Sequence, residues 1–334
     1  MKTKYILWAI ILLLGVSCSK NDEANNEPKP ESSEMVTVSL ALGGEINTSE
    51  TPLSRAGETE STNLYGVQIY EQRTNMNYPL GYAAGIFDNV ADMKINLYKD
   101  AKYQFIVTLI KNGKNLVQLN NWGYGKAPFN RKNSSYIGLD ELNMFTYGTL
   151  SEFKDLGKGT IKDDRTETHY PEADRFYGEL SDYTPEVGGT ATIELKRTAF
   201  GLKYEIENLT DGSISLVVRK DFVVSNSSKN QTLIDESGVT ESETEGRIFT
   251  FYDVRSVWLN ADNDYSESIN VEMKWLRGNN IEVDLGNIDV LVKRNKMNIL
   301  KINLAASDSD ATIGITTEDD SSMTGDEIEI PLEE

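Results

Sequence analysis

Short stretches in which apolar and polar residues alternate recur along most of this 334-residue chain, and polar turns separate them. Successive side chains of a strand point to opposite faces, so a period of two places the apolar residues on one buried face of a sheet. Many short strands of this kind predict an all-β fold of antiparallel β-sandwiches. We expect strands at residues 63–71, 190–196, 200–206, 268–276 and 281–285, and a strand pair or bulged strand at residues 247–259.

A chain of this length has room for two domains. The segment SDYTPEVGG at residues 181–189 contains a proline and a pair of glycines between regular strands, which is typical of a domain boundary. We therefore expect one β-sandwich at residues 56–186 and a second at residues 187–334. Within the first, residues 92–97 and 102–111 are expected to form a hairpin.

The first 17 residues have the pattern of an export signal. Lys2 and Lys4 precede an apolar run too short to cross a bilayer, and small residues stand directly before Cys18. This arrangement resembles a bacterial lipobox, in which the cysteine is lipidated and becomes the new N-terminus. Cys18 is the only cysteine, so no disulfide can form within the chain. The alternative is a plain secretory signal with an incidental cysteine. Residues 18–34 are polar and are expected to be a disordered tether.

The segment at residues 35–55 combines a predicted strand with a predicted cleavage point. Its alternating apolar residues indicate a buried strand face, and the polar loop after them ends at Arg55 and Ala56, where a trypsin-like protease could cut. Removal of the strand would leave an open sheet edge that a strand from another subunit could fill. By itself the segment favours an ordinary first strand followed by an ordinary loop. The apolar residues of this strand are Val36, Val38, Leu40 and Leu42.

The C-terminal segment DEIEIPLEE also has the pattern of a strand. Ile328, Ile330 and Leu332 share one face, and residues 316–325 before them form a polar, flexible lead. A strand donated to another sheet binds through backbone hydrogen bonds and is held in register by alternate side chains. The alternative is that this tail closes its own sandwich.

Charge and residue chemistry exclude several classes of function. The net charge of −20 at pH 7 repels nucleic acid and anionic membranes, which argues against both as partners. His169, in a polar loop, is the only histidine, so a His-based triad has one candidate and a zinc site lacks its usual ligands. The chain has no Gly-rich phosphate loop and no glycine-punctuated calcium loop. We expect no enzyme activity, no metal site and no cofactor.

Several short motifs occur together in this chain: the lipobox at Cys18 and residues 54–56, 64–70, 170–177, 196–202 and 292–296. Together they resemble the fimbrillin superfamily, the pilus subunits of Bacteroidales. The resemblance implies two transthyretin-like β-sandwich domains in tandem and export as a lipoprotein to the outer membrane and cell surface. It further implies a cut after Arg55, loss of the strand at residues 35–42, and polymerisation with copies of itself or other pilins through a donor strand at residues 326–332. A host or bacterial surface ligand would be a further partner.

Two other functions fit parts of the sequence. A glycan-binding surface lipoprotein that does not polymerise would use exposed aromatic residues, and Trp122 in a polar loop is the best candidate, whereas Trp275 on an alternating apolar face is assigned to the core. A secreted hydrolase is disfavoured because the histidine and cysteine chemistry is missing. The remaining aromatic candidates are Tyr124 and Trp258.

Overall fold

The computed structural model describes residues 34–46, 62–72, 79–117, 119–120, 123–124, 128–129, 154–159, 161–162, 167–168, 170–207, 212–220, 229–235, 247–277, 281–303 and 317–320. Regular structure in these ranges is almost entirely β-strand, which confirms the all-β prediction.

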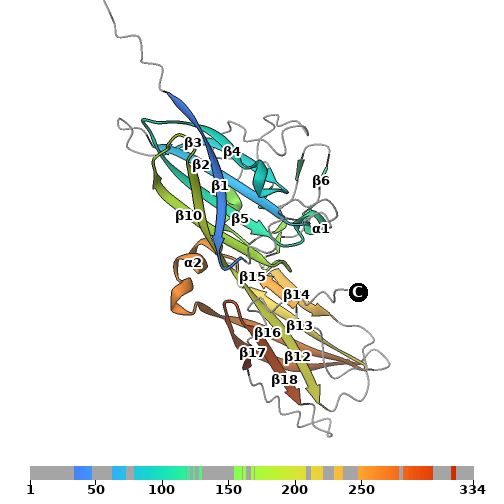
Figure 1. Ribbon diagram of the computed structural model, residues 1–334. Coiled ribbons are helices and arrows are strands. Elements are labelled where there is room, and N and C mark those ends of the chain that lie inside the picture. Colours follow the sequence, from blue (N-terminus) through green and yellow to red (C-terminus); the bar gives the residue numbers. More distant parts are fainter. Residues whose placement is uncertain are drawn as a thin grey trace, which may run out of the picture. The chain divides into compact units, whose positions relative to one another are not determined.

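Seven strands form the first sheet, in the order β3-β2-β5-β10-β11-β1-β4 (Figure 1). Adjacent strands are antiparallel except β1 and β11, which are parallel. A parallel pair needs a long connection, and here the chain between the two forms the other five strands of the sheet. The prediction of antiparallel sheets is wrong for this pair. The strands are β1 (Met35–Gly44), β2 (Leu64–Gln72), β3 (Leu80–Phe87), β4 (Lys94–Tyr98), β5 (Lys102–Ile110), β10 (Arg175–Tyr183) and β11 (Thr190–Arg197).

β11 takes part in two ladders and so joins the halves of this sheet. Its residues 190–195 pair with β1, whereas Lys196 and Arg197 pair with β10. The strands on the two sides enclose one apolar core. The predicted division after residue 186 would therefore separate β11 from the sheet with which it pairs. Fully buried members of the core come from six of the strands and include Val38, Val67, Phe87, Leu97, Phe105 and Ile193.

β4 and β5 follow one another in the chain but do not form the expected hairpin. β4 pairs with β1, while β5 pairs with β2 and β10. Ile95 of β4 and Phe105 of β5 nevertheless lie in the same core, so the turn between the strands crosses from one side of that core to the other. Two strands that pair and two strands that face one another carry the same alternating pattern, and the pattern therefore could not separate these arrangements.

β2 is buried on both faces. Tyr65, Val67 and Ile69 lie in the main core, as predicted, whereas Leu64 belongs to a smaller cluster that also contains Phe129. Gly66 stands where this cluster approaches the strand most closely, since a Cβ added there would lie 2.4 Å from Cε1 of Phe129. A glycine is therefore required for the close packing of Phe129 on β2.

We expect Gly66→Ala to lower the free energy of unfolding by about 2 kcal/mol, because the added methyl group overpacks a filled site. Denaturant unfolding measures the loss. Gly157→Ala is the matched control, since its added Cβ has Cβ of Arg255 as nearest neighbour at 3.8 Å. Equal midpoints for the two variants would show that Phe129 moves aside without cost.

The second part of the chain forms two four-stranded sheets, in the orders β15-β12-β18-β19 and β14-β13-β16-β17. Side chains from both, such as Phe200 and Val271, meet in one core. β12 and β18 are parallel, a second departure from antiparallel pairing, and β16 and β17 form the hairpin expected from the turn after Arg277. The strands are β12 (Ala199–Glu207), β13 (Ser213–Lys220), β14 (Lys229–Asp235), β15 (Arg247–Thr250), β16 (Ser266–Arg277), β17 (Ile281–Lys293), β18 (Met297–Asn303) and β19 (Thr317–Asp320).

Two predictions of local structure in this part are wrong. The segment at residues 247–259 is not a strand pair: after β15 it forms the helix α2 (Val254–Leu259), whose first turn is capped by the Asp253 carboxylate accepting from the amide of Ser256 at 2.9 Å. The lead at residues 316–325 contains β19, which pairs with β18. The short elements are α1 (Gly113–Leu116), β6 (Leu119–Asn120), β7 (Gly123–Tyr124), β8 (Ile161–Lys162), β9 (Glu167–Thr168) and the 3₁₀ turns η2 (Val90–Asp92), η4 (Lys154–Gly157) and η5 (Ala261–Asn263).

Candidate functional site: the first strand and its neighbours

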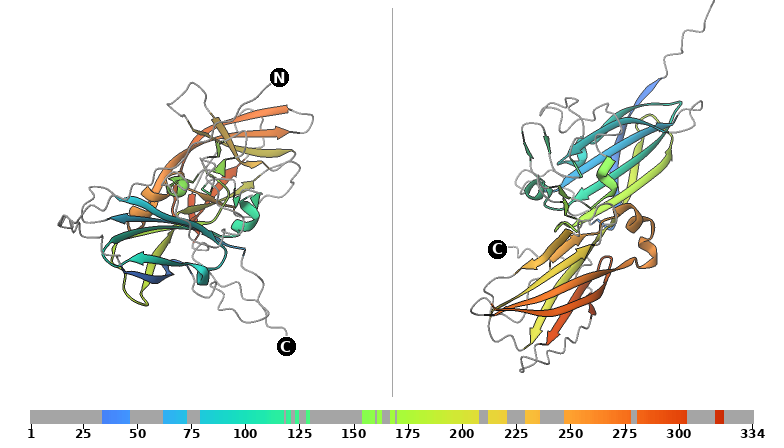
Figure 2. Two further views of the ribbon diagram at one scale, coloured as in Figure 1. Left: turned by 90° about the horizontal axis from the view of Figure 1, so that it is seen from above. Right: turned by 180° about the vertical axis from the view of Figure 1, so that it is seen from behind.

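β1 lies inside the first sheet and not at its edge. On one side Leu40 and Leu42 are in parallel register with Ala191 and Ile193 of β11, and on the other side β1 is antiparallel to β4. Figure 2 shows β1, in blue, from two further directions. Removal of β1 would therefore leave an empty strand position between β11 and β4, which we call the β1 lane. The backbones of both neighbouring strands would lose hydrogen-bond partners there.

The apolar face of β1 is a substantial part of the core. Val36, Val38, Leu40 and Leu42 are 6%, 0%, 4% and 8% exposed. Burying an aliphatic side chain of this size contributes roughly 1.5–3 kcal/mol, so the four together contribute roughly 6–12 kcal/mol. That amount is comparable to the whole stability of a typical domain. A chain that lost β1 would need another strand in its place.

A polar contact follows directly after β1. Gly44 has a φ of 90°, and a Cβ there would lie 2.3 Å from the carbonyl oxygen of Leu195, so this turn requires glycine. The turn brings Glu45 beside two donors: its Oε2 accepts from the backbone amide of Arg197 at 2.8 Å and from Nη1 of Arg294 at 2.7 Å. Glu45 thereby links β1 to the segment between β17 and β18.

The neighbouring charges around Glu45 are paired with one another. Arg197 donates to both carboxylate oxygens of Asp174, at 2.7 and 2.6 Å, and Lys196 donates to both oxygens of Asp262 at 2.7 Å. The hydrogen bond and charge of Lys196, with a smaller contribution from Arg294, lower the pKa of Asp262. Sequence reasoning missed Glu45. The motifs at residues 196–202 and 292–296, which carried the family resemblance, contain Arg197 and Arg294, the two residues that bind Glu45.

A second polar cluster joins β10 to α2. The side chain of Glu179 is only 5% exposed; it accepts two hydrogen bonds from the guanidinium of Arg255, at 2.6 and 3.2 Å, and another from the hydroxyl of Tyr177 at 2.6 Å. Glu179 raises the pKa of Arg255, while burial and the bond to Glu179 raise the pKa of Tyr177. The ring of Trp258 meets that of Tyr177 edge to face at 5.9 Å. Trp258 therefore packs at this junction.

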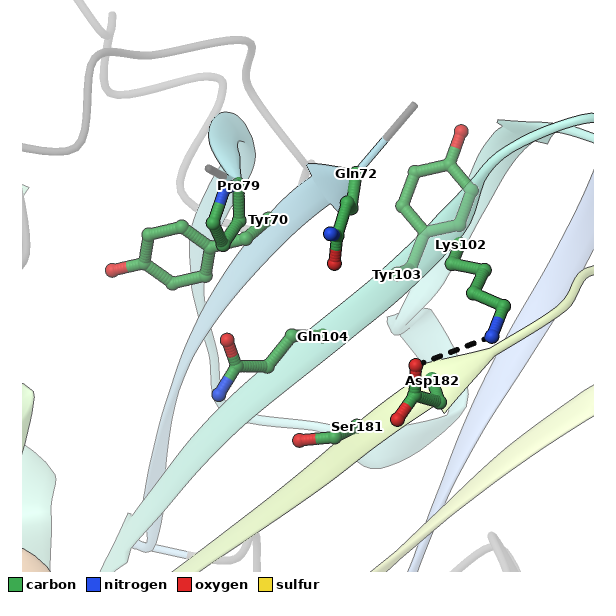
Figure 3. Close-up of a pocket in the computed structure, with 8 residues that line it drawn as sticks. All are labelled: Tyr70, Gln72, Pro79, Lys102, Tyr103, Gln104, Ser181 and Asp182. Atoms are coloured by element: carbon green, nitrogen blue, oxygen red, sulfur yellow. Dashed lines mark hydrogen bonds and ion pairs between the residues drawn. The ribbon is translucent and has the colours of Figure 1, made fainter. Parts of the chain in front are cut away.

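A small polar cavity of about 130 Å³ lies at a β-bulge of β10 (Figure 3). Asp182 in the bulge has a φ of 57°, and its carboxylate pairs with Nζ of Lys102 at 3.3 Å. Pocket volumes for organic ligands are usually about 300–1,000 Å³, so this cavity suits water or the end of a polar group. The wall is formed by Tyr70, Gln72, Pro79, Lys102, Tyr103, Gln104, Ser181 and Asp182.

Other predicted sites fall in different places. Trp275 is buried in the second core, as predicted, with the guanidinium of Arg277 4.6 Å from its ring centre.

Within the described residues no group of three or more His, Cys, Asp or Glu could hold a metal ion, and no helix has the length and apolarity to cross a membrane. The structure describes the backbone of Tyr124 and not its side chain. Outside the described residues lie Cys18, Arg55, Ala56, Trp122, His169, Ile328, Ile330 and Leu332.

Comparison with known proteins finds matches among solved structures. No family model matches the chain, and no curated protein matches it. A candidate cell adhesion protein of Bacteroides eggerthii is 10% identical, with a TM-score of 0.36 and coverage of 86% of this chain and 94% of that one. The tip fimbrial protein Mfa3 of Porphyromonas gingivalis is 10% identical, with a TM-score of 0.37 and coverage of 86% and 99%. The fimbrial anchor protein Mfa2 of the same organism is 10% identical, with a TM-score of 0.35 and coverage of 86% of this chain and 98% of that one.

These structural neighbours are thus a candidate cell adhesion protein and two fimbrial proteins. At TM-scores below 0.4, the likeness carries no argument about what this chain does.

Proposed function

We propose that this chain is a structural subunit or adhesin of a cell-surface fibre and that it polymerises by exchanging strands between copies. The observation that carries the proposal is the position of β1, an interior strand with a buried apolar face at the start of the fold. Arg55 follows it in the chain and offers a trypsin-like protease a cut that would separate β1 from the body. The proposed product is an incomplete sheet with one lane open.

The proposed filler of that lane is the segment at residues 326–332 of another copy. Its Ile328, Ile330 and Leu332 repeat the spacing of Val38, Leu40 and Leu42, so one face can occupy the same core positions. Pro331 lacks an amide hydrogen, so in this interior position it would leave a ladder hydrogen bond unmade, a cost that the apolar contacts of the segment must offset. The apolar burial that β1 loses, roughly 6–12 kcal/mol, is the driving force available to the incoming strand.

The proposal also covers export and domain organisation. Cys18 would carry the lipid that holds the precursor at the outer membrane before maturation, after removal of residues 1–17 as a signal. The body would consist of two transthyretin-like sandwiches in tandem. Because β11 pairs with β1 and β10, we place their division after Arg197.

Limited proteolysis tests the maturation step. We expect trypsin to cut the purified full chain first after Arg55 and the product to form concentration-dependent, denaturant-resistant ladders. Arg55→Ala should abolish both the cut and the ladders, whereas Lys20→Ala, which removes a basic residue from the tether, should change neither.

Deletion of residues 326–334 should stop ladder formation while the thermal midpoint of the precursor stays the same. Cut chains that remain monomeric would instead favour a surface lipoprotein that binds a ligand without polymerising.

A further inference from the structure

We propose that the lane of β1 ends in a carboxylate-binding site, formed by the guanidinium of Arg294 and the backbone amide of Arg197. Glu45 fills this site in the precursor, and an acidic side chain of the incoming segment at residues 326–334 fills it after β1 has left. The inference rests on the proposed strand exchange and adds to it a point of recognition between copies.

The geometry of the site is that of a charge-assisted hydrogen-bond pair. A single oxygen, Oε2 of Glu45, accepts from the Arg197 amide at 2.8 Å and from Nη1 of Arg294 at 2.7 Å. Bonds of this kind between a carboxylate and a cation are about twice as strong as those between neutral groups. Glu45 directly follows the β1 turn, so the removal of β1 by a cut after Arg55 also removes this carboxylate.

Arg294 is held in place by contacts that do not depend on Glu45. Its Nη2 donates to the carbonyl of Ala261 at 3.0 Å and its Nη1 to the carbonyl of Arg197 at 3.1 Å. The side chain is only 10% exposed, and among the described residues its buried Nε has no hydrogen-bond partner. Departure of Glu45 would therefore leave a cation that these carbonyl contacts still hold in place but that has lost its ion-pair partner, which favours the arrival of another carboxylate.

The nearby carboxylates are already engaged. Asp262 is bound through both oxygens to Lys196, and Asp174 through both oxygens to Arg197. For either to replace Glu45, it would have to give up a close ion pair. A carboxylate that arrives with the new strand has no such cost, so the vacated site favours an acidic residue at the end of that strand.

The tail has acidic residues at both ends of its apolar stretch. If Ile328, Ile330 and Leu332 take the positions of Val38, Leu40 and Leu42, then Glu333 and Glu334 take the positions of Gly43 and Gly44, the last two residues of β1. If the strand enters in the opposite direction, Glu327 and Asp326 take those positions. The inference therefore holds for both directions.

The incoming backbone cannot copy the glycine turn, because a Cβ at Gly44 would lie 2.3 Å from the carbonyl oxygen of Leu195. The incoming segment would therefore present its carboxylate from a straighter backbone, on a Glu side chain of the same length as that of Glu45 or on the shorter Asp326.

Peptide exchange provides the test. The full chain is cut with trypsin and mixed with labelled peptides of residues 326–334, all amidated at the C-terminus. We compare the native peptide with one in which Asp326 is Asn and Glu327, Glu333 and Glu334 are Gln, and with Glu329→Gln as a control within the strand. We expect the fourfold substitution to weaken binding at least 10-fold and Glu329→Gln to change it less than 2-fold.

Variants of the protein, combined with the peptide variants, form a double-mutant cycle. Arg294→Gln should weaken binding of the native peptide by the same factor. It should also remove the difference in affinity between the native and fourfold-substituted peptides, because an interaction already lost on one side cannot be lost again on the other. Arg255→Gln, which removes an arginine charge paired with Glu179, should leave that difference unchanged. Equal binding of the native and fourfold-substituted peptides to the unmodified protein would overturn the carboxylate site and leave strand exchange standing. Failure of every peptide to bind would overturn the proposed function and the site with it.

Discussion

Val38→Asp is expected to unfold the precursor or lower its free energy of unfolding by on the order of 4 kcal/mol or more. Val38 is 0% exposed and pairs with Ile95 of β4, so the new carboxylate would be buried among aliphatic side chains with no partner. The measurement is denaturant unfolding of the full chain at pH 7, followed by circular dichroism.

Thr37→Asp is the matched control, since Thr37 is on the opposite, exposed face of the same strand and donates to Asn96 at 2.7 Å. It should cost at most about 1 kcal/mol. In chains already cut after Arg55, Val38→Asp should also release β1 at once, which mass spectrometry of the separated fragments detects. A stable Val38→Asp precursor would mean that β1 does not contribute to the core, and the strand-exchange proposal would lose its basis.

Arg175→Met is expected to lower the free energy of unfolding by about 3 kcal/mol. Arg175 is fully buried and donates from Nε to the hydroxyl of Thr108 at 2.8 Å and from its two terminal nitrogens to the carbonyls of Lys158 and Leu156. Methionine fills similar volume, but it leaves both carbonyls without these donors.

Desolvation of the charge opposes this loss of stability. Burial lowers the pKa of Arg175 to about 9, so the buried charge destabilises the fold, and its removal would recover that free energy. We expect the loss of three hydrogen bonds to prevail, since each unsatisfied buried acceptor costs about 1–3 kcal/mol. Arg247→Met is the control: its side chain is 34% exposed, and its ion pair with Glu172 at 3.9 Å should contribute less than about 1 kcal/mol. A more stable Arg175→Met protein would show that desolvation outweighs these bonds.

The amino-acid sequence alone determined most of the strand segments and which of their faces are apolar. The alternating pattern predicts a buried face for Val36, Val38, Leu40 and Leu42, and all four are buried. The strands near residues 63–71, 190–196, 200–206 and 268–276 are confirmed as well. The physical reason is local, since the period of two in a strand is a property of its own backbone.

The tertiary structure decided which strand lies beside which. The pattern of β1 is the same whether it sits at an edge or inside a sheet, and only its parallel pairing with β11 and antiparallel pairing with β4 place it inside. Residues 254–259 became a helix because Asp253 caps the first turn and Val254 and Val257 are buried. Glu45 and Arg294 meet although they are 249 residues apart in the chain. No local pattern encodes such a contact, because it depends on how sheets that are distant in the sequence come together around their cores.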